Sequence, residues 1–225
     1  MSEAKPAVFV RVEGVLTARG ACSAAAYMAA NAAGLRERVF RLGHLAVATP
    51  LYGLLGQSDR VLANRLTYLA LRNMSEDRIA ELADEDWQNV LSRQVLAQGI
   101  DLVRRARTNG KKLVLLADSI EEIARPLSEQ LSKVDALLCN RLEYRGGRAT
   151  GKLCEPVIGG HDGGRFLERW SLEHDIDLAA STAYGAHGPD VLLMSAVGEP
   201  CAVNPDFTLR RAAREAGWPV MDFHV

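Results

Sequence analysis

The sequence lacks an excess of charge of either sign: 27 lysines and arginines stand against 28 aspartates and glutamates in 225 residues. Such a balance provides no basic surface for nucleic acid or for an anionic membrane. The sequence also lacks an apolar run long enough to cross a bilayer, since the longest, Leu45 to Leu55, is interrupted by Pro50 and Gly53. We therefore predict no nucleic-acid partner and no transmembrane segment.

Cysteine is scarce and scattered. The four cysteines form no Cys-x-x-Cys pair: Cys22, Cys139, Cys154 and Cys201. This spacing argues against a zinc knuckle or a redox motif and is typical of a reducing compartment. The first residues lead directly into an apolar strand, without the pattern of a signal peptide. We therefore expect a cytoplasmic protein.

What the sequence does contain is an alternation of strands and helices in its second half. Apolar runs at 7–12, 112–117, 134–139, 180–184 and 200–203 predict buried strands, and helical segments separate most of them. This order predicts an α/β fold with a Rossmann-like parallel sheet and helices on both faces. Residues 142–144 and 149–154 flank an Arg-Gly-Gly-Arg turn and predict a β-hairpin.

A long helical region separates the first strand from the second. Pro50 and Gly53 should interrupt one helix, and a helix beginning at Ser75 should run to about Leu96. A helix from Ser58 or Asp59 to Leu71 should present one apolar face, formed by Val61, Leu62, Leu66 and Leu69. We expect residues 18–107 to form a helical cap over a core of residues 1–17 and 108–225, which makes a lidded pocket.

Two features of the cap allow several interpretations. The apolar stretch Leu45 to Leu55 is interpreted as cap core, with pocket lining or a partner surface as alternatives. The arginines of the cap are interpreted as solvated helix faces: Arg36, Arg38, Arg41, Arg60, Arg65 and Arg72.

Two segments carry a family resemblance. Residues 11–16 read Arg-Val-Glu-Gly-Val-Leu, and residues 184–190 read Tyr-Gly-Ala-His-Gly-Pro-Asp, followed by Val-Asn-Pro-Asp at 203–206. They resemble the first motif, Asp-x-Asp-Gly-Thr-Leu, and the fourth motif and following strand of the haloacid dehalogenase (HAD) superfamily, in its phosphoserine-phosphatase-like branch. The resemblance implies a HAD-type core with a helical cap after the first strand. It also implies hydrolysis of phosphomonoesters through an aspartyl-phosphate, with magnesium.

The resemblance also locates the departures from the family pattern. The family's nucleophile falls at Arg11 and its general acid and base at Glu13. Its phosphate-binding hydroxyl falls at Ala117, its lysine at Gly163 and a metal-binding acid at Ala186, while Asp190 keeps a second acid. Since aspartyl-phosphate transfer needs a carboxylate nucleophile and a metal-neutralised phosphoryl group, we predict a pseudophosphatase with no catalytic residue, no cofactor and no magnesium binding.

The altered pocket still offers candidates for binding. An arginine cannot be buried unpaired, so Arg11 should form an internal ion-pair cluster with Glu13, Asp118 and Asp190. The alternative is that Arg11 binds an anionic ligand, because a guanidinium suits phosphate or carboxylate. The ligand-binding candidates are Arg11, Glu13, Asp118, Ser119, Arg165 and Asp190. Ser119 is interpreted as a helix N-cap, with Glu122 completing a capping box.

His161, Asp162, His187 and Asp190 are candidates for a transition-metal site. Hydrogen-bonded polar loop residues are the favoured interpretation of this set. As a whole, the sequence predicts a protein-interaction scaffold or an anionic-ligand-binding module, with a protein or a small anion as partner. The alternative is a HAD-like hydrolase with a repurposed pocket that uses Glu13, Asp190 or a histidine.

Overall fold

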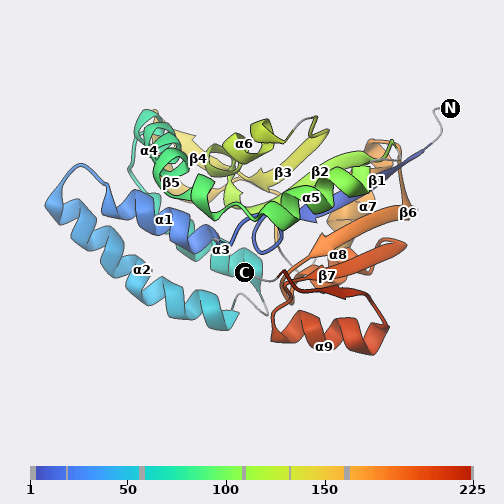
Figure 1. The fold of residues 1–225 in the computed structure, drawn as a ribbon. Helices are drawn as coiled ribbons and strands as arrows, with labels where there is room; N and C mark the ends of the chain where they lie inside the picture. Colours follow the sequence, from blue (N-terminus) through green and yellow to red (C-terminus); the bar gives the residue numbers. More distant parts are fainter. Residues whose placement is uncertain are drawn as a thin grey trace.

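A parallel six-stranded sheet forms the centre of the molecule (Figure 1). The computed structural model describes residues 4–18, 20–55, 59–107, 110–131, 133–159 and 163–223, and the side chains of 51–55 are outside that description. The strand order is β3-β2-β1-β6-β7-β8, and every neighbouring pair is parallel. The strands are β1 (Lys5–Arg11), β2 (Lys112–Ile120), β3 (Ala136–Asn140), β6 (Ile176–Gly185), β7 (Glu199–Val203) and β8 (Val220–Met221). The predicted α/β fold is confirmed.

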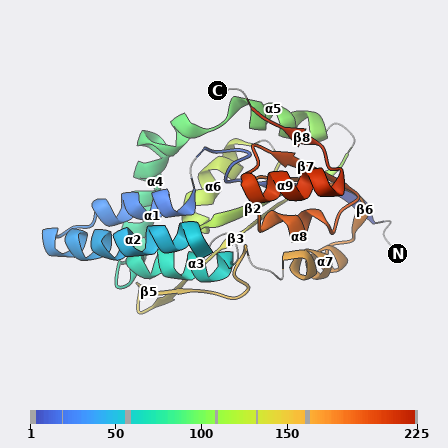
Figure 2. The same cartoon turned by 90° about the horizontal axis from the view of Figure 1, so that it is seen from below.

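Helices cover both faces of this sheet because the side chains of a strand alternate between its faces. Val8 and Val10 of β1 face the side covered by α5 (Ala97–Ala106) and α6 (Glu121–Gln130). Ala7 and Phe9 face the opposite side, covered by α7 (Gly163–Glu173), α8 (Asp190–Met194) and α9 (Phe207–Ala216). All four strand residues are fully buried. Figure 2 shows α7, α8 and α9 together on their side of the sheet.

The segment between β1 and α5 forms a second helical layer with its own core. It contains α1 (Ala21–Ala30), α2 (Leu35–Leu55), α3 (Arg60–Tyr68), η1 (Leu69–Leu71), α4 (Glu76–Asn89) and η2 (Leu91–Gln94). Met28, Tyr68 and Ile79 are fully buried there. The hairpin of β4 (Leu142–Arg145) and β5 (Arg148–Leu153) joins the same cluster, as does Ile120 at the end of β2. The cap helices are therefore packed onto the carboxyl edge of the sheet.

Two predicted helix ends were wrong. Helix α2 continues through Pro50 to Leu55. Pro50 and Ala46 are exposed, so water can reach the carbonyl that the proline ring leaves without a partner. Helix α4 ends at Asn89 instead of Leu96. The following residues bond to the loop after β1, where Leu96 N donates to Leu16 O at 2.8 Å.

The interpretation of Leu45 to Leu55 as cap core is correct for only part of the stretch. Leu45 and Ala48 are 3% and 2% exposed, but Val47 is 66% exposed. Positions 51–55 lie in α2, and their side chains are outside the description. Within the described ranges, no helix combines the length and the apolar character that a membrane span requires.

The contact between α5 and the loop after β1 depends on a glycine. A Cβ added at Gly99 would lie 2.1 Å from the carbonyl oxygen of Val15. We predict that Gly99→Ala lowers the free energy of unfolding by about 1–3 kcal/mol, because the backbone would have to move apart. Urea denaturation measures this loss. Arg104→Ala, an exposed change in the same helix, should cost less than about 0.5 kcal/mol, and equal costs for the two variants would contradict the prediction.

Candidate functional site

The predicted site residues meet at the carboxyl edge of the sheet. Arg11 is the last residue of β1, Asp118 lies near the end of β2, and Asp190 begins α8 after β6. Because β1 is hydrogen-bonded to both β2 and β6, these three side chains come together at the place where open α/β sheets bind ligands. All three are at most 4% exposed.

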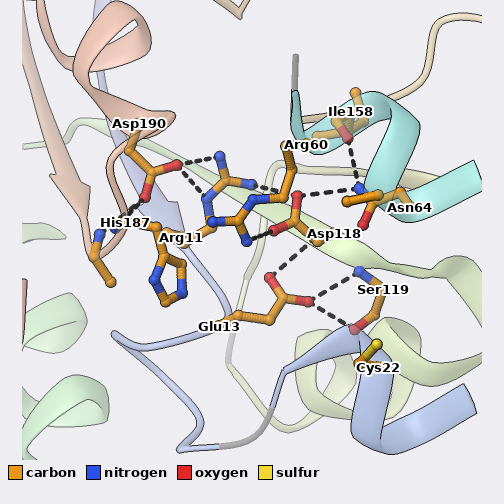
Figure 3. A network of polar contacts seen from close by, with 12 residues as sticks. Arg11, Glu13, Cys22, Arg60, Asn64, Asp118, Ser119, Ile158, His187 and Asp190 are labelled. Atoms are coloured by element: carbon orange, nitrogen blue, oxygen red, sulfur yellow. Dashed lines mark hydrogen bonds and ion pairs between the residues drawn. The ribbon is translucent and has the colours of Figure 1, made fainter. Parts of the chain in front are cut away.

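Arg11 points into carboxylates rather than into open space (Figure 3). Its Nε donates to Asp190 Oδ1 at 2.8 Å, and its Nη1 donates to Asp118 Oδ1 at 3.3 Å. Its Nη2 donates to the same oxygen of Asp190. The other oxygen, Oδ2 of Asp190, accepts the backbone N–H groups of Ala186 and His187, each at 2.9 Å. The guanidinium therefore links the end of β2 to the start of α8.

A second arginine reaches the site from the cap. Arg60, at the start of α3, is 8% exposed, and its Nη1 donates to Asp118 Oδ2 at 2.8 Å. Asn64, one turn further along, is fully buried and donates to the Ile158 carbonyl at 3.0 Å. We call Arg11, Arg60, Asp118 and Asp190 the ion-pair cluster. It joins the cap to the core through the carboxylate of Asp118.

Glu13 borders the ion-pair cluster and is held by the last residues of β2. It accepts from the backbone N–H of Asp118 at 3.0 Å, from the backbone N–H of Ser119 at 2.9 Å and from Ser119 Oγ at 2.6 Å. The interpretation of Ser119 as an N-cap was wrong: Ile120 is the N-cap of α6 and makes no side-chain cap bond. The Ser119 hydroxyl instead donates its hydrogen bond to the carboxylate of Glu13, which is 2% exposed.

Burial and charge together set the protonation of these groups. Burial and the nearby charge of Asp118 raise the pKa of Glu13. Burial also opposes the charge of Asp190, but the guanidinium groups of Arg11 and Arg60 outweigh it and lower the pKa of Asp190 to about 2. Burial opposes the charge of Arg11, and the carboxylates of Asp190 and Asp118 still raise its pKa. Arg11 and Asp190 are thus charged across the physiological range.

The backbone packs closely around these side chains. A Cβ at Gly159 would lie 2.6 Å from both Arg60 Cγ and Asp118 Oδ1. At Gly14, which has a φ of 88°, a Cβ would lie 2.5 Å from the Cβ of Ala186. A cavity of about 10 Å³ lies beside Ser119, which is at most enough for one water molecule. A side chain at either glycine would therefore collide with residues of the site.

The other candidates are not members of the ion-pair cluster, although the backbone N–H of His187 donates to Asp190 Oδ2 at 2.9 Å. Arg165 lines a cleft of about 870 Å³ together with Arg65 and Trp170. The ring of His187 is half-buried, with Nδ1 3.8 Å from Asp206 Oδ2. His161 and Asp162 lie outside the described residues. Within the described ranges, no three histidine, cysteine or acidic side chains are grouped as a metal ion would require.

Arg60 and Asn64 are site residues that the sequence did not indicate. The interpretation of the cap arginines as solvated was wrong for Arg41 and Arg60, which are 4% and 8% exposed. The apolar face expected for the helix after residue 58 was wrong: Leu62 and Leu69 are each 40% exposed, while Arg60, Asn64 and Tyr68 point inward. The inward face is polar because it covers a polar site, and Tyr68 OH accepts from Ile120 N at 3.1 Å. The signal available in the sequence was the Arg60, Asn64, Tyr68 spacing of four residues.

The fold and the motif positions define the class of the protein: the chain belongs to the haloacid dehalogenase-like hydrolase family, whose model matches residues 16–195. Its relatives and structural neighbours are those of the phosphoserine-phosphatase-like branch. Within the described ranges, the cap, the parallel sheet and the hairpin agree with that assignment.

Individual relatives agree with this class. The chain is 27% identical over 153 residues to an "inhibition of morphological differentiation protein" of Streptomyces azureus, covering 68% of this chain and 55% of that one. It is 27% identical over 177 residues to a phosphoserine phosphatase of Mycobacterium tuberculosis, covering 77% and 57%. The chain therefore spans a little over half the length of these two curated relatives.

Solved structures share the fold over almost the whole chain. A Bordetella pertussis protein of unknown function superimposes with a TM-score of 0.81 at 22% identity, covering 97% of this chain and 99% of that one. A substrate-bound phosphoserine phosphatase superimposes with a TM-score of 0.70 at 16% identity, covering 98% and 94%.

Removal of Arg11 should show how much the ion-pair cluster contributes to stability. Arg11→Ala would leave the buried carboxylates of Asp118 and Asp190 with one guanidinium instead of two. We expect a loss of about 3–5 kcal/mol in the free energy of unfolding, measured by urea denaturation. Arg125→Ala breaks an exposed pair with Glu121 and should cost no more than about 1 kcal/mol. A small cost at Arg11 would show that the cluster is not stabilising its carboxylates.

Stability should also depend on pH through Asp190. Its pKa is lowered from 3.8 to about 2 in the folded protein, so its charge adds stability that is present above pH 4 and lost as the pH falls toward 2. The contribution is roughly 2 kcal/mol. Asp190→Asn should remove this dependence, seen by comparing urea unfolding of the two proteins between pH 6 and pH 3. Parallel stability curves would contradict the assignment.

Proposed function

We propose that this chain is a catalytically inactive member of its family that acts as a protein-interaction scaffold. The observation that supports the proposal is the position of Arg11, whose guanidinium lies between the carboxylates of Asp118 and Asp190. In the family pattern this position belongs to the carboxylate that attacks phosphorus. A guanidinium carries no nucleophilic lone pair at any ordinary pH and only donates hydrogen bonds.

The remaining groups do not replace the missing chemistry. Glu13, at the position of the general acid and base, already accepts three hydrogen bonds from Asp118 and Ser119. A carboxylate held in this way is oriented toward the backbone at the end of β2. Ala186 stands where the family has an acid, and it offers only a methyl group. The site therefore contains acids but no free nucleophile among its described residues.

The residues present do not fit a magnesium ion. Mg²⁺ requires oxygen ligands arranged as an octahedron. The side-chain oxygens available are those of Glu13, Asp118 and Asp190, and both oxygens of each carboxylate already accept hydrogen bonds from Arg11, Arg60, Ser119 or backbone N–H groups. The positive charge of the arginines occupies the space between these carboxylates. We therefore propose that magnesium binding is lost, and we assign no step to it.

The same pairing favours a scaffold over an anion-binding module. A phosphate or carboxylate ligand would have to displace Asp118 or Asp190 from Arg11, and the displaced carboxylate would remain buried without its partner. A repurposed hydrolase is also less well supported. The raised pKa of Glu13 would suit a general base, but both of its carboxylate oxygens already accept hydrogen bonds from Asp118 and Ser119.

Activity measurements test this proposal directly. We expect the purified chain, with magnesium, to hydrolyse p-nitrophenyl phosphate and phosphoserine no faster than its Glu13→Gln variant. The reason is that neither protein has a carboxylate at position 11. Magnesium-dependent hydrolysis by the wild-type chain that is lost in Glu13→Gln would overturn the proposal.

A second experiment tests whether restoring the family's residues produces phosphatase activity. The triple variant Arg11→Asp, Gly163→Lys and Ala186→Asp returns three family residues to the site together. Hydrolysis by this variant alone would show that the substituted positions, and not the rest of the fold, account for the inactivity of the wild-type chain. The thermal unfolding of each variant is measured first, so that only folded proteins are compared.

A further inference from the structure

Helix α2 presents large apolar side chains to solvent on the outside of the cap. Val39, Phe40 and Val47 are 64%, 78% and 66% exposed, although they belong to a 21-residue helix whose opposite side packs on α1 and α3. Figures 1 and 2 both show α2 at the outer side of the cap, away from the sheet. These three exposed apolar side chains lie within nine residues and form an apolar patch. Such a patch on a protein surface indicates an interaction site.

A glycine lies at the centre of this patch. Gly43 is exposed, and a Cβ placed on it would meet nothing within 4 Å. Glycine in a helix interior is less stable than alanine, and no contact within the described chain requires it here. A small residue on an exposed helix face allows a second helix to cross at a short distance between the two backbones.

The patch is arranged symmetrically about Gly43. Val39 and Val47 lie four residues before and after it, on one i±4 row of the helix. Phe40 and Ala46 lie three residues before and after it, one large and one small. When two copies of α2 cross antiparallel at Gly43, each Val39 meets a Val47, and each Phe40 meets an Ala46.

We propose that two copies of this chain associate through α2, antiparallel, with the helices crossing at Gly43. The occupant of the patch is a second copy because the patch is complementary to itself, which an interface with twofold symmetry requires. A parallel pairing would place Phe40 against Phe40 directly beside the crossing point. The antiparallel pairing also directs the exposed Arg36 toward the C-terminal end of the partner helix, where the helix dipole favours cations.

The contact is confined to one helix of each copy, at the small end of specific interfaces. We therefore expect reversible, concentration-dependent self-association. The proposal does not depend on the proposed loss of phosphatase activity, because α2 contributes no residue to the ion-pair cluster. The activity assays test the proposed function and the association measurements test the α2 contact, so either proposal can be contradicted without the other.

Charge substitutions at the two valines test both the contact and its direction. Val39→Glu and Val47→Lys should each weaken self-association about tenfold or more, as followed by sedimentation velocity over a range of concentrations. A mixture of these two variants should recover association, because one Glu–Lys pair and one Val–Val pair then face each other. The double variant, with two such pairs, should also associate, whereas a parallel dimer would oppose like charges.

Two further variants separate the contact from general effects. Leu172→Glu places the same charge on a leucine of α7 that is 81% exposed, and it should leave association unchanged. Gly43→Leu should abolish association without lowering the thermal unfolding midpoint, because the new side chain enters open space in the single chain. Circular dichroism confirms that each variant keeps its helices.

The outcomes that overturn the proposal are distinct. A wild-type chain that stays monomeric at about 100 µM, or Leu172→Glu acting as strongly as Val39→Glu, would remove α2 as a dimer contact. Failure of the mixture and of the double variant to associate would exclude the antiparallel geometry. A monomer that binds lipid vesicles, and loses this binding in Val39→Glu, would assign the patch to a membrane surface instead.

Discussion

The carboxylate of Asp118, paired with two guanidinium groups, is the interaction that joins the cap of this molecule to its core. One oxygen accepts from Arg11 of the sheet at 3.3 Å and the other from Arg60 of the cap at 2.8 Å. Buried charges are tolerated only when each has its partner. The position of the cap helix α3 is therefore tied to the end of β2 by electrostatics as well as by the apolar core around Tyr68.

The fold of the family and the residues of its site depend on different positions of this chain. The sheet, cap and hairpin superimpose on a phosphoserine phosphatase with a TM-score of 0.70. A hydrophobic core needs only apolar side chains at the right positions, and Val8, Val10 and Phe9 supply them whatever residue follows at position 11. The site requires particular side chains, and in this protein Arg11 lies there between the carboxylates of Asp118 and Asp190. Fold and function can diverge in this way because they depend on different residues.

The sequence predicted the sheet well because buried parallel strands are continuous apolar runs, and it predicted the pairing of Arg11 because a buried guanidinium must have carboxylate partners. It failed where polar residues face inward. Helix α3 turns Arg60 and Asn64 toward the site, so a search for an apolar face selected its outer side. Ser119 preceded a helix and was assigned to its cap, although Glu13, 106 positions earlier, takes its hydroxyl. Contacts at such separation leave no local pattern to be recognised.

Gly159 has a consequence for how this site can change over evolutionary time. A side chain there would meet both Arg60 and Asp118, so the loop before α7 closes the ion-pair cluster from a third side. Altering one charged member alone would leave its partners unbalanced, and a side chain at Gly159 could not be added to compensate. Substitutions in this region are therefore expected to arise as compensated pairs, and a return to the family pattern one residue at a time would pass through unstable proteins.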